Sequence, residues 1–138
     1  MKSARFGERG FTTTVFAIFM PILLAFLALC ADGAIFIYYR ISLETASDAA
    51  SLAGIDAYDR DIWYSENRIV IQQERAEELV REVLMDNMPK ARLLKVEVPE
   101  ETPNVCRVEA EVDVPLHFLQ LFGVDSQTIS AVSLAHGK

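Results

Sequence analysis

The residue types that most often perform catalysis or bind metals are few in this 138-residue sequence and are not grouped. The two histidines, His117 and His136, lie in a loop-like stretch and near the carboxyl terminus, with no nucleophile or carboxylate constellation patterned around them. Glu109, Glu111 and Asp113 alternate along one predicted strand and so share a face, which is typical of a solvated surface and less often of a calcium site. The sequence therefore predicts neither an enzyme nor a bound cofactor or metal.

The two cysteines lie in different parts of the predicted structure. Cys30 stands at the boundary of a long apolar segment, whereas Cys106 falls in a predicted strand. We expect them not to pair with each other, and two cysteines give no disulfide framework. A bridge between the Cys30 residues of two copies is the alternative.

The most distinctive element is an uncharged run of 21 residues from Phe11 to Ala31. A helix of this length covers about 31 Å, which matches the hydrocarbon thickness of a bilayer. Large apolar residues lie all round such a helix, unlike those of a helix on the core of a soluble protein. Pro21 is tolerated in membrane helices, where we expect a kink. We therefore predict a transmembrane helix over residues 11–31.

Charge placement predicts the orientation of this helix. Lys2, Arg5 and Arg9 outnumber Glu8 in residues 1–10, and basic flanks stay on the cytoplasmic side. The remaining 10 Lys and Arg (13 less 3) face 19 Asp and Glu (20 less 1), so the exported part carries −9. This acidic balance disfavours nucleic acid and anionic lipid as partners.

Three forms of processing would alter this picture. A secretory signal peptide has an apolar core of about 7 to 15 residues, shorter than this one, and the site ending at Cys30 is a poor cleavage site. A lipoprotein signal needs a small residue at position 29, where Leu29 stands. A prepilin-type basic leader would be cut between Gly10 and Phe11, but Val15 stands where prepilins usually carry glutamate. Cleavage after Gly10 stays open.

The helical pattern continues beyond the membrane over residues 32–57. Its small residues recur at spacings of three and four and so form a narrow stripe on one face: Ser42, Ala46, Ala49, Ala50, Ala53 and Ala57. The stripe would pack either against a neighbouring subunit's helix or against the chain's own sheet, and the second is favoured because a small domain needs this face for its core.

Small residues also predict where the membrane-spanning part of the helix contacts other helices, because close packing drives helix association in the bilayer. The expected helix-packing positions there are Ala17, Ala25, Ala28 and Gly33. Asp32 follows the predicted span directly. We expect its carboxylate to be solvated in the headgroup region, and pairing with a basic group on a partner is the alternative.

Residues 58–138 are predicted to form a small extracytoplasmic α+β domain. A polar, turn-prone interval leads to an amphipathic helix near Ile69 to Met88, which Pro89 ends. The period then changes to two, and it predicts strands at Leu94–Val98, Cys106–Val114 and Thr128–Ala135. We expect a roughly three-stranded antiparallel sheet.

An apolar stretch, residues 115–124, precedes the last predicted strand. It holds too many large apolar residues for a fully solvated loop: Leu116, Phe118, Leu119, Leu121 and Phe122. They would fold onto the core, dip into the membrane surface or meet a partner, and folding onto the core is the favoured alternative.

Four segments of the chain carry a family resemblance. They are Glu8-Arg9-Gly10-Phe11, residues 16–24 (FAIFMPILL), Ala31-Asp32-Gly33-Ala34 and residues 39–54 (YRISLETASDAASLAG), the last being the most specific. Residues 8–54 resemble the amino-terminal region of the TadE/TadG-like proteins of the bacterial tight-adherence (Tad, or Flp) pilus machinery. Asp32 and Asp48 are the polar residues of the shared motif. The carboxyl-terminal pattern is compatible with the short members of this family.

The resemblance implies a minor pilin (pseudopilin) or assembly accessory in the bacterial inner membrane, with a long helix set against a small antiparallel sheet. Implied partners are other Tad/Flp pilus subunits or homologous minor pilins, in a homo- or hetero-oligomer, and a prepilin peptidase. No metal is implied, because Asp125-Ser126-Gln127-Thr128 does not fit the metal motif of the longer, adhesion-type members. The alternative function is a membrane-tethered extracytoplasmic binding domain unrelated to a pilus.

Overall fold

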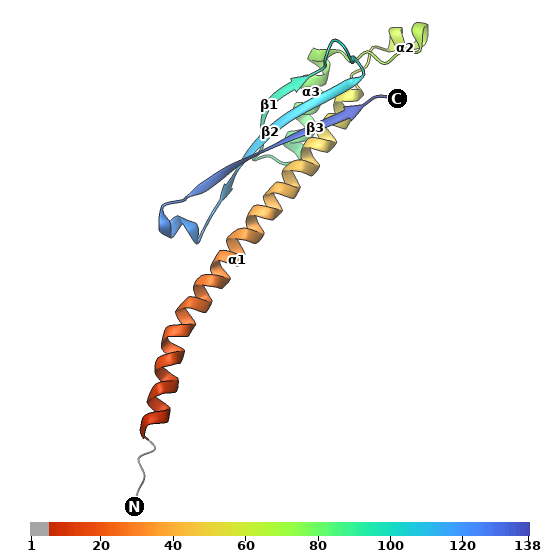
Figure 1. The fold of residues 1–138 in the computed structure, drawn as a ribbon. Helices are drawn as coiled ribbons and strands as arrows, with labels where there is room; N and C mark the ends of the chain where they lie inside the picture. Colours follow the sequence, from red (N-terminus) through yellow and green to blue (C-terminus); the bar gives the residue numbers. More distant parts are fainter. Residues whose placement is uncertain (1–5) are drawn as a thin grey trace, which may run out of the picture.

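The computed structural model describes residues 6–138, with side chains from Gly10 onward. One helix, α1 (Phe6–Ile55), accounts for 50 of these residues and continues through Pro21 and Gly33 (Figure 1). At 1.5 Å per residue it is about 75 Å long. The expected continuous helix is therefore present, ending two residues before the predicted Ala57. Lys2 and Arg5 of the predicted leader lie outside the described residues.

The amino-terminal half of α1 extends away from the rest of the protein (Figure 1). It is the one described helix long and apolar enough to cross a membrane, and no residue of its most apolar 18-residue window is buried. Side chains such as Phe16, Ile22 and Phe26 are each about 60% exposed. A large unburied apolar surface of this kind is stable when an apolar medium or another protein covers it.

Two shorter helices follow. The short α2 (Arg60–Glu66) lies where we predicted an irregular polar interval, so that prediction was wrong. The Asp59 side chain caps it by accepting hydrogen bonds from the backbone N–H groups of Asp61 and Ile62 at 2.9 and 3.3 Å. Trp63 in this helix packs edge-to-face on Tyr58. Figure 1 shows α2 at the end of the domain remote from the amino-terminal half of α1.

The helix α3 (Gln73–Asn87) begins four residues later than the predicted Ile69. The reason is that the preceding residues are extended and pair with other segments. Ile71 donates its backbone N–H to the Pro103 carbonyl at 2.9 Å, and Gln72 donates to the Ala57 carbonyl at 2.9 Å. The buried face of α3 consists of Ala76, Val80 and Leu84.

The sheet has three antiparallel strands in the order β1-β2-β3, namely Arg92–Glu97, Val105–Pro115 and Ser126–His136. The pairing of β2 with β3 is unbroken over 11 residues. The α+β class with a three-stranded antiparallel sheet is as predicted. An irregularity between Leu93 and Lys95 contradicts the predicted alternation in β1, because it turns Leu94 outward, where it is 51% exposed.

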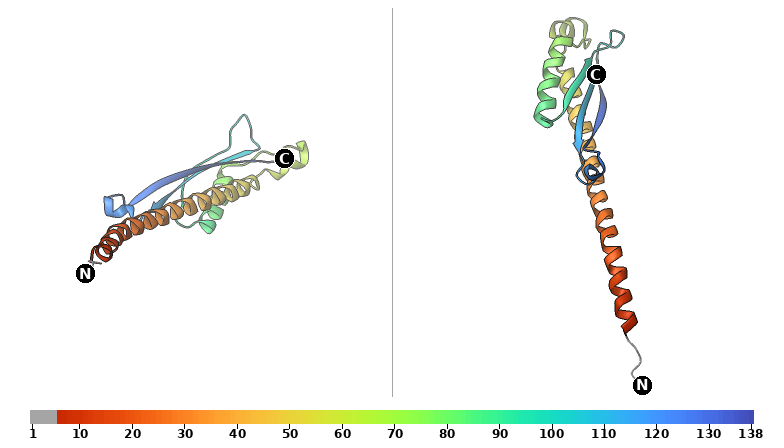
Figure 2. Two further views of the ribbon diagram at one scale, coloured as in Figure 1. Left: turned by 60° about the horizontal axis from the view of Figure 1, so that its bottom comes forward. Right: turned by 90° about the vertical axis from the view of Figure 1, so that its left-hand side faces the viewer.

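The core lies between one face of the sheet and two helices. The carboxyl-terminal half of α1 packs on β2 and β3, and α3 packs beside α1 and against β1 (Figure 2). The inward-facing residues of β2 alternate, as the period of two requires, and are fully buried at Val108, Ala110 and Val114. The first fully buried core residue of α1 is Leu43, so the core begins well beyond the apolar half of this helix.

Candidate functional site

Asp32 connects α1 to the tip of the β2–β3 hairpin. Its carboxylate accepts three backbone hydrogen bonds, from the N–H groups of His117 (2.9 Å, to Oδ1), Phe118 (2.8 Å, to Oδ2) and Leu119 (2.9 Å, to Oδ2). These are the residues that lead into the short 3-10 helix η1 (Leu119–Phe122), whose first N–H groups have no partner within the helix. We expected Asp32 to be solvated, and this was wrong: it is 2% exposed.

The electrostatics of this contact favour an ionised carboxylate. Burial alone would raise the pKa of Asp32, but the three N–H groups and the nearby His117 outweigh it and lower the pKa below its ordinary value. Asp32 therefore stays charged at neutral pH, and its charge is satisfied by the hairpin. No basic partner is needed to explain its burial.

The hairpin tip divides its apolar residues between core and surface. Leu116 is buried, and Leu119 is half-buried against the core. Leu121 and Phe122 are 78% and 72% exposed, so the expectation that this stretch folds onto the core holds for only part of it. Gly123 closes the tip with a φ of +85°, in the left-handed region that glycine adopts readily.

Asp48 connects α1 to the edge strand β3 through a chain of hydroxyls. The Ser133 hydroxyl donates to Asp48 Oδ1 at 2.6 Å, and its oxygen lies 2.9 Å from the Ser51 hydroxyl. Ser51 and Ser133 are buried, so this small network satisfies hydroxyls that would otherwise be costly in the core. Asp32 and Asp48, both implicated by the resemblance, thus each tie the long helix to the sheet.

The alanine stripe of α1 faces its own domain. Ala46 and Ala50 are buried in the core, and Ala49 and Ala53 are half-buried. Gly54 lies near the end of the stripe, where α1 passes close to Cys106 of β2. A Cβ built on it would overlap Cys106 Sγ and lie 3.0 Å from Val80 Cγ2, so a larger residue here would force a neighbouring side chain to move.

The predicted contacts near the membrane remain on the surface. Ala17, Ala25 and Gly33 are exposed, and Ala28 is half-buried. The positions of the predicted leader cleavage, Gly10 and Phe11, lie in the exposed first turns of α1. No atom comes within 4 Å of a Cβ built on Gly33. These small residues are therefore accessible to a partner helix.

A second set of apolar residues is exposed on α1 beyond the predicted span. Tyr38, Ile41 and Leu52 are 68%, 58% and 61% exposed. Their spacings of three and eleven residues place them on one face of the helix, opposite the face that carries the buried core residues Leu43 and Ala50. The outer part of α1 therefore presents an apolar face to its surroundings.

The residues whose types could act in catalysis or bind a metal are dispersed over the structure. Cys30 and Cys106 are both free in this chain, and burial raises the pKa of the Cys106 thiol, which keeps it protonated. Arg92 binds the carboxylates of Glu111 and Asp113 at 3.0 and 2.8 Å on the outer face of the sheet. Among the described residues, no three His, Cys, Asp or Glu side chains are placed to hold a metal ion.

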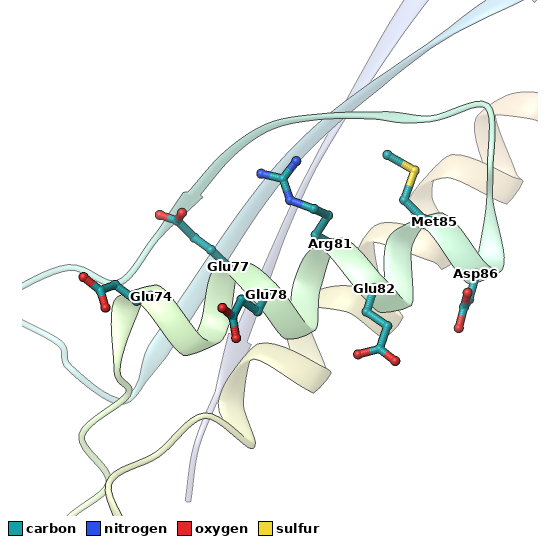
Figure 3. Close-up of a pocket in the computed structure, with 7 residues that line it drawn as sticks. All are labelled: Glu74, Glu77, Glu78, Arg81, Glu82, Met85 and Asp86. Atoms are coloured by element: carbon teal, nitrogen blue, oxygen red, sulfur yellow. The ribbon is translucent and has the colours of Figure 1, made fainter.

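The outer surface of α3 is acidic. It carries Glu74, Glu77, Glu78, Glu82 and Asp86, together with Arg81 and Met85. Figure 3 shows these side chains spread along the helix, with none converging on a common point. This surface is therefore a solvated helix face, and it adds to the negative charge of the domain.

Sequence reasoning missed two of these connections. The Ser51–Ser133 contact joins residues 82 positions apart, and the Asp32 contact joins residues 85 to 87 apart. The one available signal for Asp32 was a charge placed directly after an apolar helix, followed much later by an apolar loop.

Comparison with protein-family models, with characterised proteins and with solved structures gives no match for this chain. The fold and the surfaces described above therefore carry the functional argument.

Proposed function

We propose that this chain is a membrane-anchored minor pilin or accessory subunit of a Tad/Flp-type pilus assembly system. The observation that carries the proposal is the division of α1. Its amino-terminal half is apolar and unburied, and the same unbroken helix then forms one side of a small α+β domain. A subunit of this shape is anchored through one end of a rigid helix and presents its domain at a fixed position.

The sequence supports the same assignment through the segments that resemble TadE/TadG-like proteins, from Glu8 to Gly54. Basic residues before the apolar segment favour a cytoplasmic amino terminus and an extracytoplasmic domain in the bacterial inner membrane. The exposed small residues Ala17, Ala25 and Gly33 suit contacts with other transmembrane helices. The apolar face at Tyr38, Ile41 and Leu52 suits contacts with other subunits outside the bilayer.

The first experiment is amino-terminal sequencing and intact mass of the protein from native membranes, with and without the prepilin peptidase. For a processed minor pilin we expect a new terminus at Phe11 that depends on the peptidase. An intact leader would instead make the chain a fixed membrane anchor of the assembly apparatus.

A second experiment tests the pilus assignment itself. Deletion of the gene should reduce surface fibres, and the full chain should restore them. A variant carrying Tyr38→Asp and Ile41→Asp should restore them poorly, whereas Glu44→Gln, on the exposed side of the same helix, should restore them fully. Unchanged fibres after deletion would contradict the proposal and favour a membrane-tethered binding domain.

A further inference from the structure

The tip of the β2–β3 hairpin is an exposed apolar surface with a fixed position. Its exposed residues Leu121, Phe122 and Val124 are 78%, 72% and 40% accessible. The segment from Pro115 to Gln127 that bears them has a single formal charge, on Asp125, within a domain that is otherwise rich in acidic residues. Exposed apolar clusters of this kind mark surfaces that contact a membrane or another protein.

The tip is rigid. The Asp32 carboxylate holds the backbone at its beginning, and the N–H groups of Gly123 and Val124 close its end by donating to the carbonyls of Gln120 and Leu119 at 3.0 and 3.1 Å. Phe118 and Phe122 pack edge-to-face with their ring centroids 5.5 Å apart. Leu121 and Phe122 are therefore presented outward by a loop that is tied at both ends.

The position of the tip relative to the predicted membrane span is also fixed. Asp32 is the first residue after the span, so its bonds to residues 117–119 hold the hairpin tip level with the last turn of that span. Figure 1 shows the tip at the end of the sheet nearest the amino-terminal half of α1, whereas α2 and the carboxyl terminus lie at the opposite end.

An apolar groove joins the tip to the span. It is lined by Leu29, Gly33 and Phe36 of α1 and by Leu116, Leu119 and Val124 of the hairpin, with Asp32 and Gln127. Leu29 belongs to the predicted membrane-spanning segment, so the groove is continuous with the lipid-facing surface of that helix. Lipid or another protein could cover the groove and the tip. A helix that crosses the bilayer at Leu29 places both of them at the bilayer surface, so lipid is the occupant that we favour.

We propose that the β2–β3 hairpin tip is a second membrane contact, in which Leu121, Phe122 and Val124 enter the interfacial layer of the bilayer that α1 crosses. This inference rests on the membrane anchoring within the proposed function, but it requires no pilus. The contact is apolar in origin, so zwitterionic lipid suffices and the acidic character of the domain does not oppose it. Two contacts in place of one fix the tilt and rotation of α1 relative to the membrane.

Depth-dependent quenching of tryptophan fluorescence tests the inference in the full chain. Trp63 is the single native tryptophan, and Trp63→Phe provides a dark background. Three single-tryptophan variants are then compared in phosphatidylcholine vesicles whose acyl chains carry bromine at defined depths: F122W for the tip, F26W for the span and Y64W for the remote end of the domain. Phe122 and Tyr64 are similarly exposed, at 72% and 82%, so they form a matched pair.

We expect F122W to be quenched and blue-shifted, more by bromine near the headgroups than by bromine near the chain ends, and Y64W to be unaffected. Adding Leu121→Asp should reduce the quenching of F122W, and adding Leu134→Asp, at an exposed position on β3, should not. Quenching of F26W without quenching of F122W would overturn the tip contact and leave the anchor in place. If the indole of F122W is shielded from water only in native membranes, where other proteins are present, the contact of the tip with lipid is also overturned. Absence of quenching of F26W would overturn the anchor and the tip contact together.

Discussion

At the scale of single residues, the buried polar side chains of the described residues meet a specific partner in all but one case. The Asp32 carboxylate is matched to three N–H groups, and the Ser133 hydroxyl is matched to Asp48 and Ser51. Ser47 is the exception among the described residues, because its buried hydroxyl has no hydrogen-bond partner. Removing a buried polar group that has a partner should lower the free energy of unfolding, whereas removing one without a partner should leave it unchanged or raise it.

The first prediction concerns Asp32 and pH. Because the pKa of Asp32 in the folded state is below its ordinary value of 3.8, its contribution to stability is present above that pH and is lost as the pH falls through the lower, folded-state pKa. We expect the amide protection factors of His117, Phe118 and Leu119 to fall over this acidic range. Hydrogen exchange measured residue by residue checks this.

Asp32→Asn should lower the same protection factors at neutral pH, because its NH2 group is a donor in place of one of the two carboxylate oxygens that accept these N–H groups, and the negative charge is lost. The control is Glu44→Gln, at an exposed position that pairs with Arg40. Protection that is equal in Asp32→Asn and in the parent chain would show that the carboxylate does not hold the hairpin tip.

The second prediction contrasts two buried serines. Ser133→Ala should lower the free energy of unfolding by about 1–2 kcal/mol, because it leaves Ser51 without one partner and Asp48 without its donor. Ser47→Ala should leave it unchanged or raise it slightly, because the hydroxyl removed has no partner to lose. Chemical denaturation in detergent micelles measures both values, and equal losses in the two variants would contradict the argument.

At the scale of elements, the domain depends on how closely α1 approaches the sheet. Small side chains on one face of α1 allow the approach, and Gly54 marks the point where α1, β2 and α3 come together. Close packing of this kind leaves no room for an added methyl group unless a neighbour moves. The crossing is therefore a sensitive point of the fold.

The third prediction is made at this crossing. Gly54→Ala should lower the free energy of unfolding by about 1–3 kcal/mol, because the new Cβ would overlap Cys106 Sγ. Cys106→Ala removes that sulfur, so the double variant should lose less than the sum of the two single variants. Gly33→Ala, in the same helix but with no atom within 4 Å of the new Cβ, should be neutral or stabilising by up to about 1 kcal/mol. Strict additivity of the two single losses would contradict the predicted contact.

At the scale of the whole molecule, one helix contributes a buried face to the core along its carboxyl-terminal half and leaves its apolar amino-terminal half unburied. The buried core of α1 begins at Leu43, with partly buried Ile35, Phe36 and Tyr39 packed against it. None of the exposed apolar residues before Leu29 contributes to this core. Folding of the domain and the proposed membrane anchoring should therefore be separable.

The fourth prediction tests this separation. A chain of residues 29–138 keeps Asp32 and the groove around it, and we expect it to fold cooperatively in water without detergent. Circular dichroism and thermal unfolding check the fold, and the full chain is the control, which we expect to require detergent or lipid. Failure of residues 29–138 to fold would show that the apolar half of α1 also supports the domain.

Local patterns in the sequence were enough to predict the main elements. An uncharged run of 21 residues, a helical period over residues 32–57 and a period of two in the last third depend only on neighbouring residues, and each predicts an element that the structure contains. The strand boundaries differ by two residues or fewer from those predicted, because the alternation itself marks where a strand faces the core. The same patterns missed α2, since a helix of seven residues is too short to show a period.

Tertiary structure alone decided how these elements are joined. Whether Asp32 is solvated or buried depends on a hairpin 85 residues away, and whether Leu94 faces in or out depends on one irregularity in its pairing with β2. The exposure of Leu121 and Phe122, beside a buried Leu116 of the same apolar stretch, likewise depends on where the hairpin meets α1. Burial and contact with a partner residue are properties of distant residues brought together. The sequence therefore determined the long apolar helix and the other elements, and only the fold decided which of their residues are held inside and which stay exposed.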